Sequence, residues 1–89
     1  MIKVDKIDDM TFNVTVEDRR VTTHRVTVDP SYQEKLTGGS VTAETLVKKS
    51  CEFLLDRESN TSILSAFDLP VIGRYFPEYE KTIRKMLQE

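Results

Sequence analysis

Residues 42–57 carry apolar side chains at the spacing of one face of an α-helix. The stripe consists of Ala43, Leu46, Val47, Ser50, Cys51 and Leu54. Side chains three, four, seven and eight positions apart share a helix face, so these residues predict the longest helix of the chain, near 42–57. Thr42 is the expected N-cap, because its hydroxyl can accept a hydrogen bond from a free amide of the first turn.

A pattern with a period of two precedes this helix and predicts an antiparallel β-hairpin at residues 10–28. The apolar positions of its first strand are Met10, Phe12, Val14 and Val16. A three-residue loop at 18–20 would place these side chains on the same face as the even-numbered residues of the second strand, which are Thr22, His24, Val26 and Val28. Thr23, Arg25 and Thr27 would then lie on the opposite face.

The rest of the chain, residues 30–88, is expected to be mostly helical. Asp29 and Pro30 suit the start of a helix, and the glycines at 38 and 39 suit its end. Short helical pieces are expected after residue 60, where Ile63, Leu64 and Phe67 make one apolar cluster, and Leu69, Ile72, Tyr75 and Phe76 share a face of the next piece. The acidic N-terminal residues 1–9 read as a solvated stretch. We therefore expect one α+β domain over residues 1–89, in which a hairpin is followed by about four helices.

Composition limits the classes of function. The net charge is −2 and the isoelectric point is near 5.4, so there is no overall attraction to nucleic acid or to an anionic membrane. The single cysteine, Cys51, excludes an internal disulfide and fits a reducing compartment. We find no membrane span or signal peptide in the sequence and expect a cytoplasmic location.

Chemically reactive residues are few. His24 is the only histidine and falls in a predicted strand, and Cys51 falls on the apolar stripe of the main helix. Both are interpreted as interior residues, because a catalytic thiolate needs a positive, partly exposed setting and a catalytic histidine needs partners. One Cys and one His also fall short of a four-ligand zinc site. We therefore expect no catalytic residue, no metal and no cofactor.

One stretch offers a hypothesis of DNA binding. Residues 19–28 hold several cations and no acid, and Arg25 would stand between Thr23 and Thr27 on the exposed strand face. Arginine can bond guanine with two hydrogen bonds, and threonine can contact the methyl group of thymine. Exposed strands also carry such residues merely to stay soluble.

The order of strand, short helix, glycine-containing loop and amphipathic helix resembles the ribbon-helix-helix fold. The resemblance rests on residues 23–30, 41–47 and 53–57. In that family two chains pair their strands, outward strand side chains read bases, and the second helix begins at a phosphate. The resemblance implies base contacts for Thr23, Arg25 and Thr27 and a phosphate contact for Thr42.

Taken whole, the chain resembles a set of short prokaryotic proteins of unassigned function. The similar segments are 32–39, 53–58, 62–64, 67–69 and 75–79. This resemblance implies no activity. Our leading hypothesis is a non-catalytic protein-interaction or regulatory module that binds a protein partner or itself, with an unpaired hairpin edge suited to strand addition. A ribbon-helix-helix-like DNA-binding regulator is the second hypothesis and a small enzyme the third.

Overall fold

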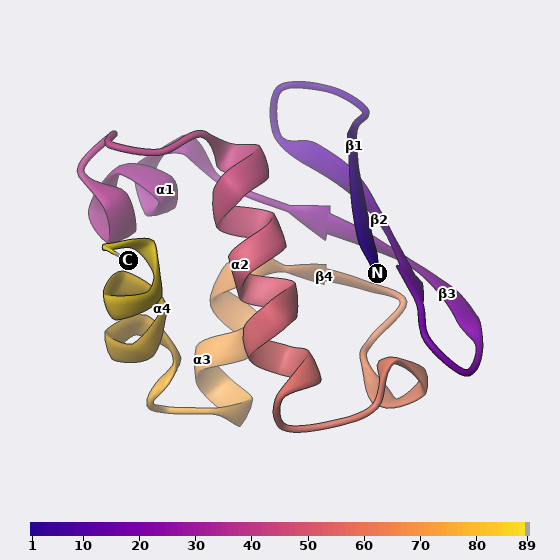
Figure 1. The fold of residues 1–89 in the computed structure, drawn as a ribbon. Helices are drawn as coiled ribbons and strands as arrows, with labels where there is room; N and C mark the ends of the chain where they lie inside the picture. The colour runs from indigo at the N-terminus through magenta and orange to yellow at the C-terminus, as the bar shows by residue number, and fades with distance from the viewer. Residues whose placement is uncertain (89) are drawn as a thin grey trace.

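A computed structural model of the protein describes residues 1–88 (Figure 1). The elements, in chain order, are β1 (Ile2–Lys6), β2 (Thr11–Glu17), β3 (Val21–Thr27), α1 (Pro30–Thr37), α2 (Ala43–Leu55), η1 (Asn60–Ser62), β4 (Ala66–Asp68), η2 (Leu69–Val71), α3 (Ile72–Tyr75) and α4 (Tyr79–Leu87), where η1 and η2 are 3₁₀ helices. The predicted α+β class is confirmed, and so is the placement of the longest helix.

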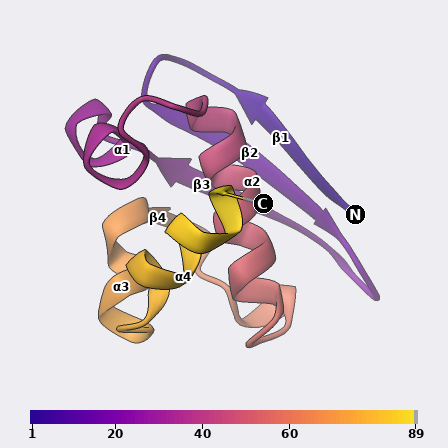
Figure 2. The same ribbon diagram turned by 60° about the vertical axis from the view of Figure 1, so that its left-hand side comes forward.

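The strands form a single sheet in the order β1-β2-β3-β4. The pairs β1–β2 and β2–β3 are antiparallel, whereas β3 and β4 are parallel. Parallel neighbours need a long crossover connection, which α1 and α2 supply here. In Figures 1 and 2, α2 crosses one face of the sheet and the other helices lie on the same side. The opposite face of the sheet is therefore not covered by any helix of the described chain.

The register predicted for the hairpin is confirmed. Phe12 pairs with Val26, Val14 with His24, and Val16 with Thr22 across the three-residue loop 18–20. All the side chains of these pairs are buried except that of Thr22, which is half-buried. The alternation of apolar and polar residues thus selected the covered face correctly, because a shift of one residue would have turned every side chain over.

The expectation of a solvated stretch at residues 1–9 is wrong for its first part. Ile2–Lys6 form β1, in which Ile2 pairs with Val16 and Val4 pairs with Val14. These two apolar side chains are half-buried in the core. Pairing with β2 satisfies backbone groups that a free segment would leave to water, so the strand forms despite a charged sequence.

The expectation of helical pieces between residues 60 and 68 also needs correction. Only the single 3₁₀ turn of η1 is helical, and Ala66–Asp68 form β4 instead. The residues Arg25, Val26 and Thr27 pair with Ala66, Phe67 and Asp68. Tyr75, expected on a buried face with Leu69 and Ile72, is instead 66% exposed.

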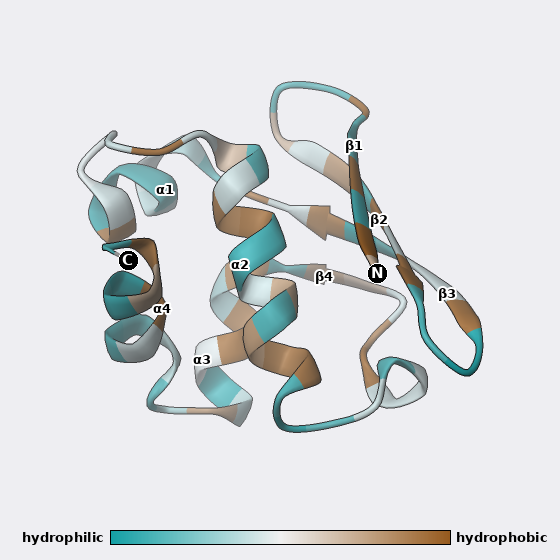
Figure 3. Ribbon diagram, in the orientation of Figure 1, coloured by the Kyte–Doolittle hydropathy of each residue, from teal (hydrophilic) through white to brown (hydrophobic). Residues whose placement is uncertain are grey.

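Helix α2 joins the sheet to the C-terminal helices. Its apolar face shares one core with the strand residues, and hydrophobic positions along it are visible in Figure 3. The Thr42 hydroxyl accepts a hydrogen bond from the Thr45 amide at 3.2 Å, as expected of an N-cap. At the other end, the Arg57 guanidinium lies 3.6 Å from the centroid of the Phe53 ring and donates to the Phe53 carbonyl.

Helix α1 has the predicted ends. The Asp29 carboxylate accepts a hydrogen bond from the Ser31 amide at 2.8 Å, and Gly38 ends the helix with a φ of 64°. Glycine suits that left-handed conformation because it has no Cβ to clash. The Tyr32 hydroxyl donates to Glu80 at 3.0 Å and so ties α1 to α4. None of the helices within residues 1–88 is long and apolar enough to cross a membrane.

Candidate binding groove

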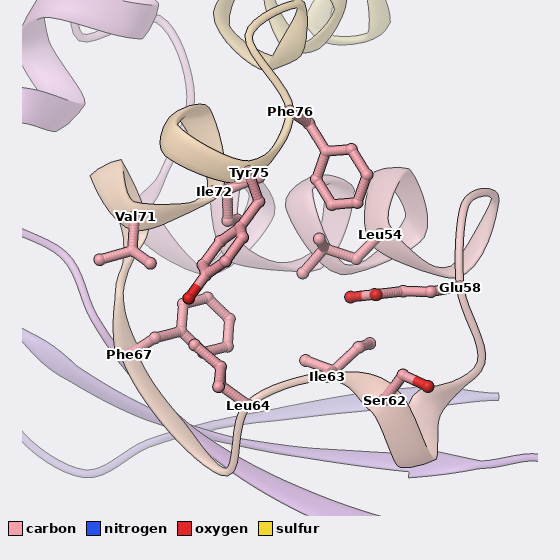
Figure 4. Close-up of a pocket in the computed structure, with 10 residues that line it drawn as sticks. All are labelled: Leu54, Glu58, Ser62, Ile63, Leu64, Phe67, Val71, Ile72, Tyr75 and Phe76. Atoms are coloured by element: carbon pink, nitrogen blue, oxygen red, sulfur yellow. The ribbon is translucent and has the colours of Figure 1, made fainter.

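An apolar groove lies at the C-terminal end of α2 (Figure 4). Its volume is about 270 Å³, and its walls come from four parts of the chain. The lining residues are Leu54 of α2, Glu58, Ser62, Ile63, Leu64, Phe67 of β4, Val71 of η2, Ile72 and Tyr75 of α3, and Phe76. Several short elements within residues 54–76 therefore meet around one cavity.

Short elements explain why this cavity stays open. β4, η2 and α3 have three, three and four residues, and Pro77 follows Phe76 immediately. A residue before proline is pushed out of the helical region, and Phe76 indeed has an extended conformation that ends α3. Because α3 stops after one turn, it covers only part of the apolar surface beside it.

The floor and the mouth of the groove differ in exposure. Leu54, Ile63 and Ile72 are buried at its floor. Leu64 at 47% and Tyr75 at 66% exposure are large apolar side chains that border it. Exposed apolar residues are ordinary when single, but a pair bordering one apolar cavity is typical of an interaction site.

Glu58 gives the groove its charge. It is the only acidic or basic residue of the lining, and Figure 4 shows its carboxylate end directed into the cavity. None of the ion pairs found among residues 1–88 involves Glu58. The neighbouring Arg57 instead pairs with Glu78 at 3.4 Å. The groove thus offers an apolar surface beside one negative charge that has no cationic partner in the described chain.

A buried polar network holds one wall of the groove against the sheet. The Nδ1 of His24 lies 2.8 Å from the carbonyl oxygen of Leu64, so this nitrogen carries the proton and donates. In the neutral ring Nε2 is then an acceptor and receives the hydroxyl proton of Thr22, also at 2.8 Å. The side-chain amide of Asn60 donates to the Thr22 hydroxyl oxygen at 3.0 Å and to the Arg20 carbonyl at 2.9 Å.

His24 and Cys51 are both buried, as the sequence predicted. The two ring nitrogens of His24 are occupied by Leu64 and Thr22, and neither is bonded to the thiol. Burial raises the pKa of the Cys51 thiol to about 12, and the nearby Glu52 carboxylate adds to the effect. Within residues 1–88, no group of three or more His, Cys, Asp and Glu side chains is arranged to hold a metal ion.

The four residues considered for DNA contact do not share one surface. Thr23, Arg25 and Thr27 lie on the uncovered face of the sheet, whereas Thr42 begins α2 on the covered side. Among the described strands, β3 also has a neighbour along each edge, since β2 flanks it on one side and β4 pairs with residues 25–27 on the other. Residues 25–27 therefore have no free edge for the intermolecular strand pairing that the ribbon-helix-helix family uses, whereas Thr23 lies on the part of β3 that β4 leaves unpaired.

The charge of the uncovered sheet face is mixed. Arg25 pairs with Asn13, which in turn pairs with Asp5, and Asp68 lies opposite Thr27. Arg25 also contributes to lowering the pKa of Asp8, after the hydrogen bonds of Met10 and Thr11 to that carboxylate. A face that places carboxylates around its arginine gives little of the positive potential on which phosphate binding depends.

The sequence predicted the apolar clusters that line the groove, but it did not predict the groove itself. Ile63, Leu64 and Phe67 were recognised as one apolar cluster, and Ile72, Tyr75 and Phe76 as part of another. The useful signal was that no long helix was available to bury both clusters. No local sequence pattern indicated that Glu58 would supply the charge of the groove or that Asn60 would bond to the sheet beneath its wall.

No family model matches the chain, and neither a curated protein nor a solved structure shows significant similarity to it. The groove and the sheet are therefore interpreted from their own geometry.

Proposed function

We propose that the protein is a small non-catalytic interaction module whose groove binds an apolar segment of a partner protein that carries a lysine or arginine beside its apolar anchor. The observation that supports this most directly is the groove itself, with Leu64 and Tyr75 exposed at its rim and Glu58 directed into it. Apolar anchors with a flanking charge are the usual way a peptide is recognised by a groove.

The size of the groove favours side chains over a cofactor. Small-molecule sites in proteins usually measure about 300–1,000 Å³ and place several polar groups around the ligand. This cavity has about 270 Å³, and only Glu58, Ser62 and Tyr75 bring polar side-chain atoms to it. That volume suits one or two apolar side chains of a peptide.

The charge at the groove selects among partners. A carboxylate taken out of water beside a bound apolar chain would be costly unless a cation accompanied it. A lysine or arginine next to the anchor supplies that cation, while an acidic partner would be repelled.

The residues that line the groove do not favour a catalytic function. The lining contains no histidine, cysteine or lysine, so no imidazole or amine is beside the Ser62 hydroxyl to activate it as a nucleophile. A general acid–base pair is what hydrolytic and transfer reactions require. The groove therefore fits binding better than chemistry.

The experiment is a selection of displayed random peptides of about 12 residues on the immobilised protein, with the winners then titrated by fluorescence. We expect enriched peptides to share a large apolar residue close to a lysine or arginine. Leu64→Ser and Tyr75→Ser should weaken their binding at least about fivefold, and Glu58→Lys should weaken it and favour acidic peptides.

The matched control is Val21→Ser, which removes an equally exposed apolar side chain from the first residue of β3, away from the groove. It should leave peptide binding unchanged. Enrichment of peptides that bind the groove variants as tightly as the parent protein would refute the proposal, and so would a failure to enrich any sequence.

A further inference from the structure

β1 is one of the two edge strands of the sheet, and the other, β4, has only three residues. The longer edge, that of β1, is ready to pair with another strand. Met1 and Glu17 exchange both backbone hydrogen bonds at 2.9 Å, and the Ile7 amide donates to Thr11. Odd-numbered residues of this segment therefore point their N–H and C=O groups at β2. In antiparallel pairing the alternate residues point theirs the other way, so those of Ile2, Val4 and Lys6 face outward.

Of the two hairpin strands, β2 offers no free edge, and β3 has an unpaired edge only at residues 21–24. β2 lies between β1 and β3, and β3 is joined to β4 at residues 25–27. Asn60 further occupies the Arg20 carbonyl, and the Arg25 amide donates to Ser65 at 2.8 Å. The longest unpaired edge among the described strands thus belongs to β1, which precedes the predicted hairpin.

A second copy of β1 can pair with the first in only a few antiparallel registers. Partners must point to the same face, so the two residue numbers of a pair must both be odd or both be even. The central registers set Lys3 against Lys3, Val4 against Val4, or Asp5 against Asp5. The first and third place like charges directly opposite each other, which is destabilising.

The register centred on Val4 sets opposite charges against each other, and its one mixed pair is Ile2 with Lys6. Lys3 of each copy meets Asp5 of the other, in the type of pair whose side chains approach most closely. Met1, which is 85% exposed, meets Ile7, which is 53% exposed. The outward backbone groups of Ile2, Val4 and Lys6 all become paired. Charged residues normally protect an edge strand, but here their signs and spacing make the strand complementary to itself.

We infer that two copies of the chain associate through antiparallel pairing of β1 about a two-fold axis at Val4, which joins their sheets into one. Lys3 and Asp5 take part in no ion pair found among residues 1–88, so they are available to a partner. Ile2 and Val4 are half-buried in the single chain and would lose most of their remaining exposure. This inference concerns a different surface from the groove and does not depend on the proposed function.

Charge reversal tests the register. Lys3→Glu places carboxylates opposite Asp5, and Asp5→Lys places ammonium groups opposite Lys3, so each variant alone should self-associate at least about tenfold more weakly. An equimolar mixture of the two variants should restore dimers, because each new charge then meets its opposite. The doubly exchanged protein should also dimerise. Sedimentation from about 1 to about 300 µM measures all four cases.

The control is Lys81→Glu on α4, which changes the net charge as Lys3→Glu does and lies away from β1. It should dimerise as the parent does. A parent protein that stays monomeric over the whole concentration range would refute the inference. So would single variants that remain dimeric, or a mixture that fails to recover although each variant gives the circular dichroism spectrum of the folded parent.

Amide exchange gives a readout that needs no variant. The amides of Val4 and Lys6 face outward in one chain and should exchange rapidly at low concentration. Both should become protected as the protein concentration rises through the dimerisation range, while the exchange of Thr23 on the uncovered face of β3 stays constant. Dimerisation without protection at Val4 would place the interface elsewhere and overturn the inference.

Discussion

The hydroxyl groups of Ser50 and Tyr79 lie 2.7 Å apart in the fully buried interior between α2 and α4. Ser50 also lies 2.7 Å from the carbonyl oxygen of Leu46, an acceptor that can only receive its single proton. Tyr79 must therefore be the donor to Ser50. Burial raises the pKa of Tyr79 above its usual range, so the hydroxyl keeps this proton at any physiological pH.

The direction of this hydrogen bond predicts that removing one hydroxyl group will lower the free energy of unfolding more than removing the other. Ser50→Ala leaves the buried Tyr79 hydroxyl with no acceptor and should lower the free energy of unfolding by about 1–3 kcal/mol. Tyr79→Phe leaves Ser50 bonded to Leu46 and should cost about 1 kcal/mol. The double variant should cost less than the sum of the two. Urea denaturation followed by circular dichroism measures all three, and additive losses would contradict the assignment.

The wall of the groove should depend on the buried network beneath it. Asn60→Ala removes the donor to the Arg20 carbonyl and to Thr22, which should destabilise the protein by about 1–3 kcal/mol. Hydrogen exchange should accelerate first at residues 61–65 and much less within α2. The control is Thr61→Ala, an exposed neighbour whose loss should change neither quantity. Uniform acceleration over the whole chain would show that Asn60 does not position this wall selectively.

The thiol of Cys51 should be unreactive while the protein is folded. With a pKa of about 12, about one thiol in ten thousand is ionised near pH 8, whereas an unfolded cysteine is ionised to about a quarter. Labelling with a chromogenic disulfide reagent should thus be at least about a thousandfold slower in native buffer than in concentrated urea. Rapid labelling of the folded protein would contradict the interior placement of this side chain.

The turn between β1 and β2 should make stability depend on pH. The Asp8 carboxylate accepts hydrogen bonds from the amides of Met10 and Thr11, and these bonds lower its pKa. A lowered pKa in the folded state stabilises the protein above the unfolded value of about 3.9, and this contribution is lost as the pH falls through the folded value.

Asp8→Ala should therefore lower the melting temperature at neutral pH, and the difference from the parent should shrink below about pH 4. Asp8→Asn keeps an acceptor oxygen but cannot ionise, so its melting temperature should fall less at neutral pH. Calorimetry at a series of pH values compares the three proteins. A difference between Asp8→Ala and the parent that persists unchanged in acid would exclude this role of the carboxylate.

Features that depend on neighbours in sequence were predictable. The pairing of Phe12 with Val26 followed from alternation and from the length of one loop, and the caps at Asp29 and Thr42 followed from local hydrogen-bonding chemistry. The interior placement of His24 and Cys51 came from periodicity alone. Each of these depends on interactions within a few turns or across one hairpin, which is the range over which residue patterns carry information.

Features that join distant segments were decided by tertiary structure. β4 has three residues and no recognisable alternation, and it is a strand because β3 presents its edge to it after a crossover of about 40 residues. β1 forms because β2 satisfies its backbone groups, against the indication of its charges. The groove exists because the fold brings Leu54 of α2 and Ile72 of α3 to the same cavity. Backbone pairing across the sheet and packing across the core act between residues that no local pattern relates. For that reason β4, the free edge of β1 and the groove form only in the folded chain.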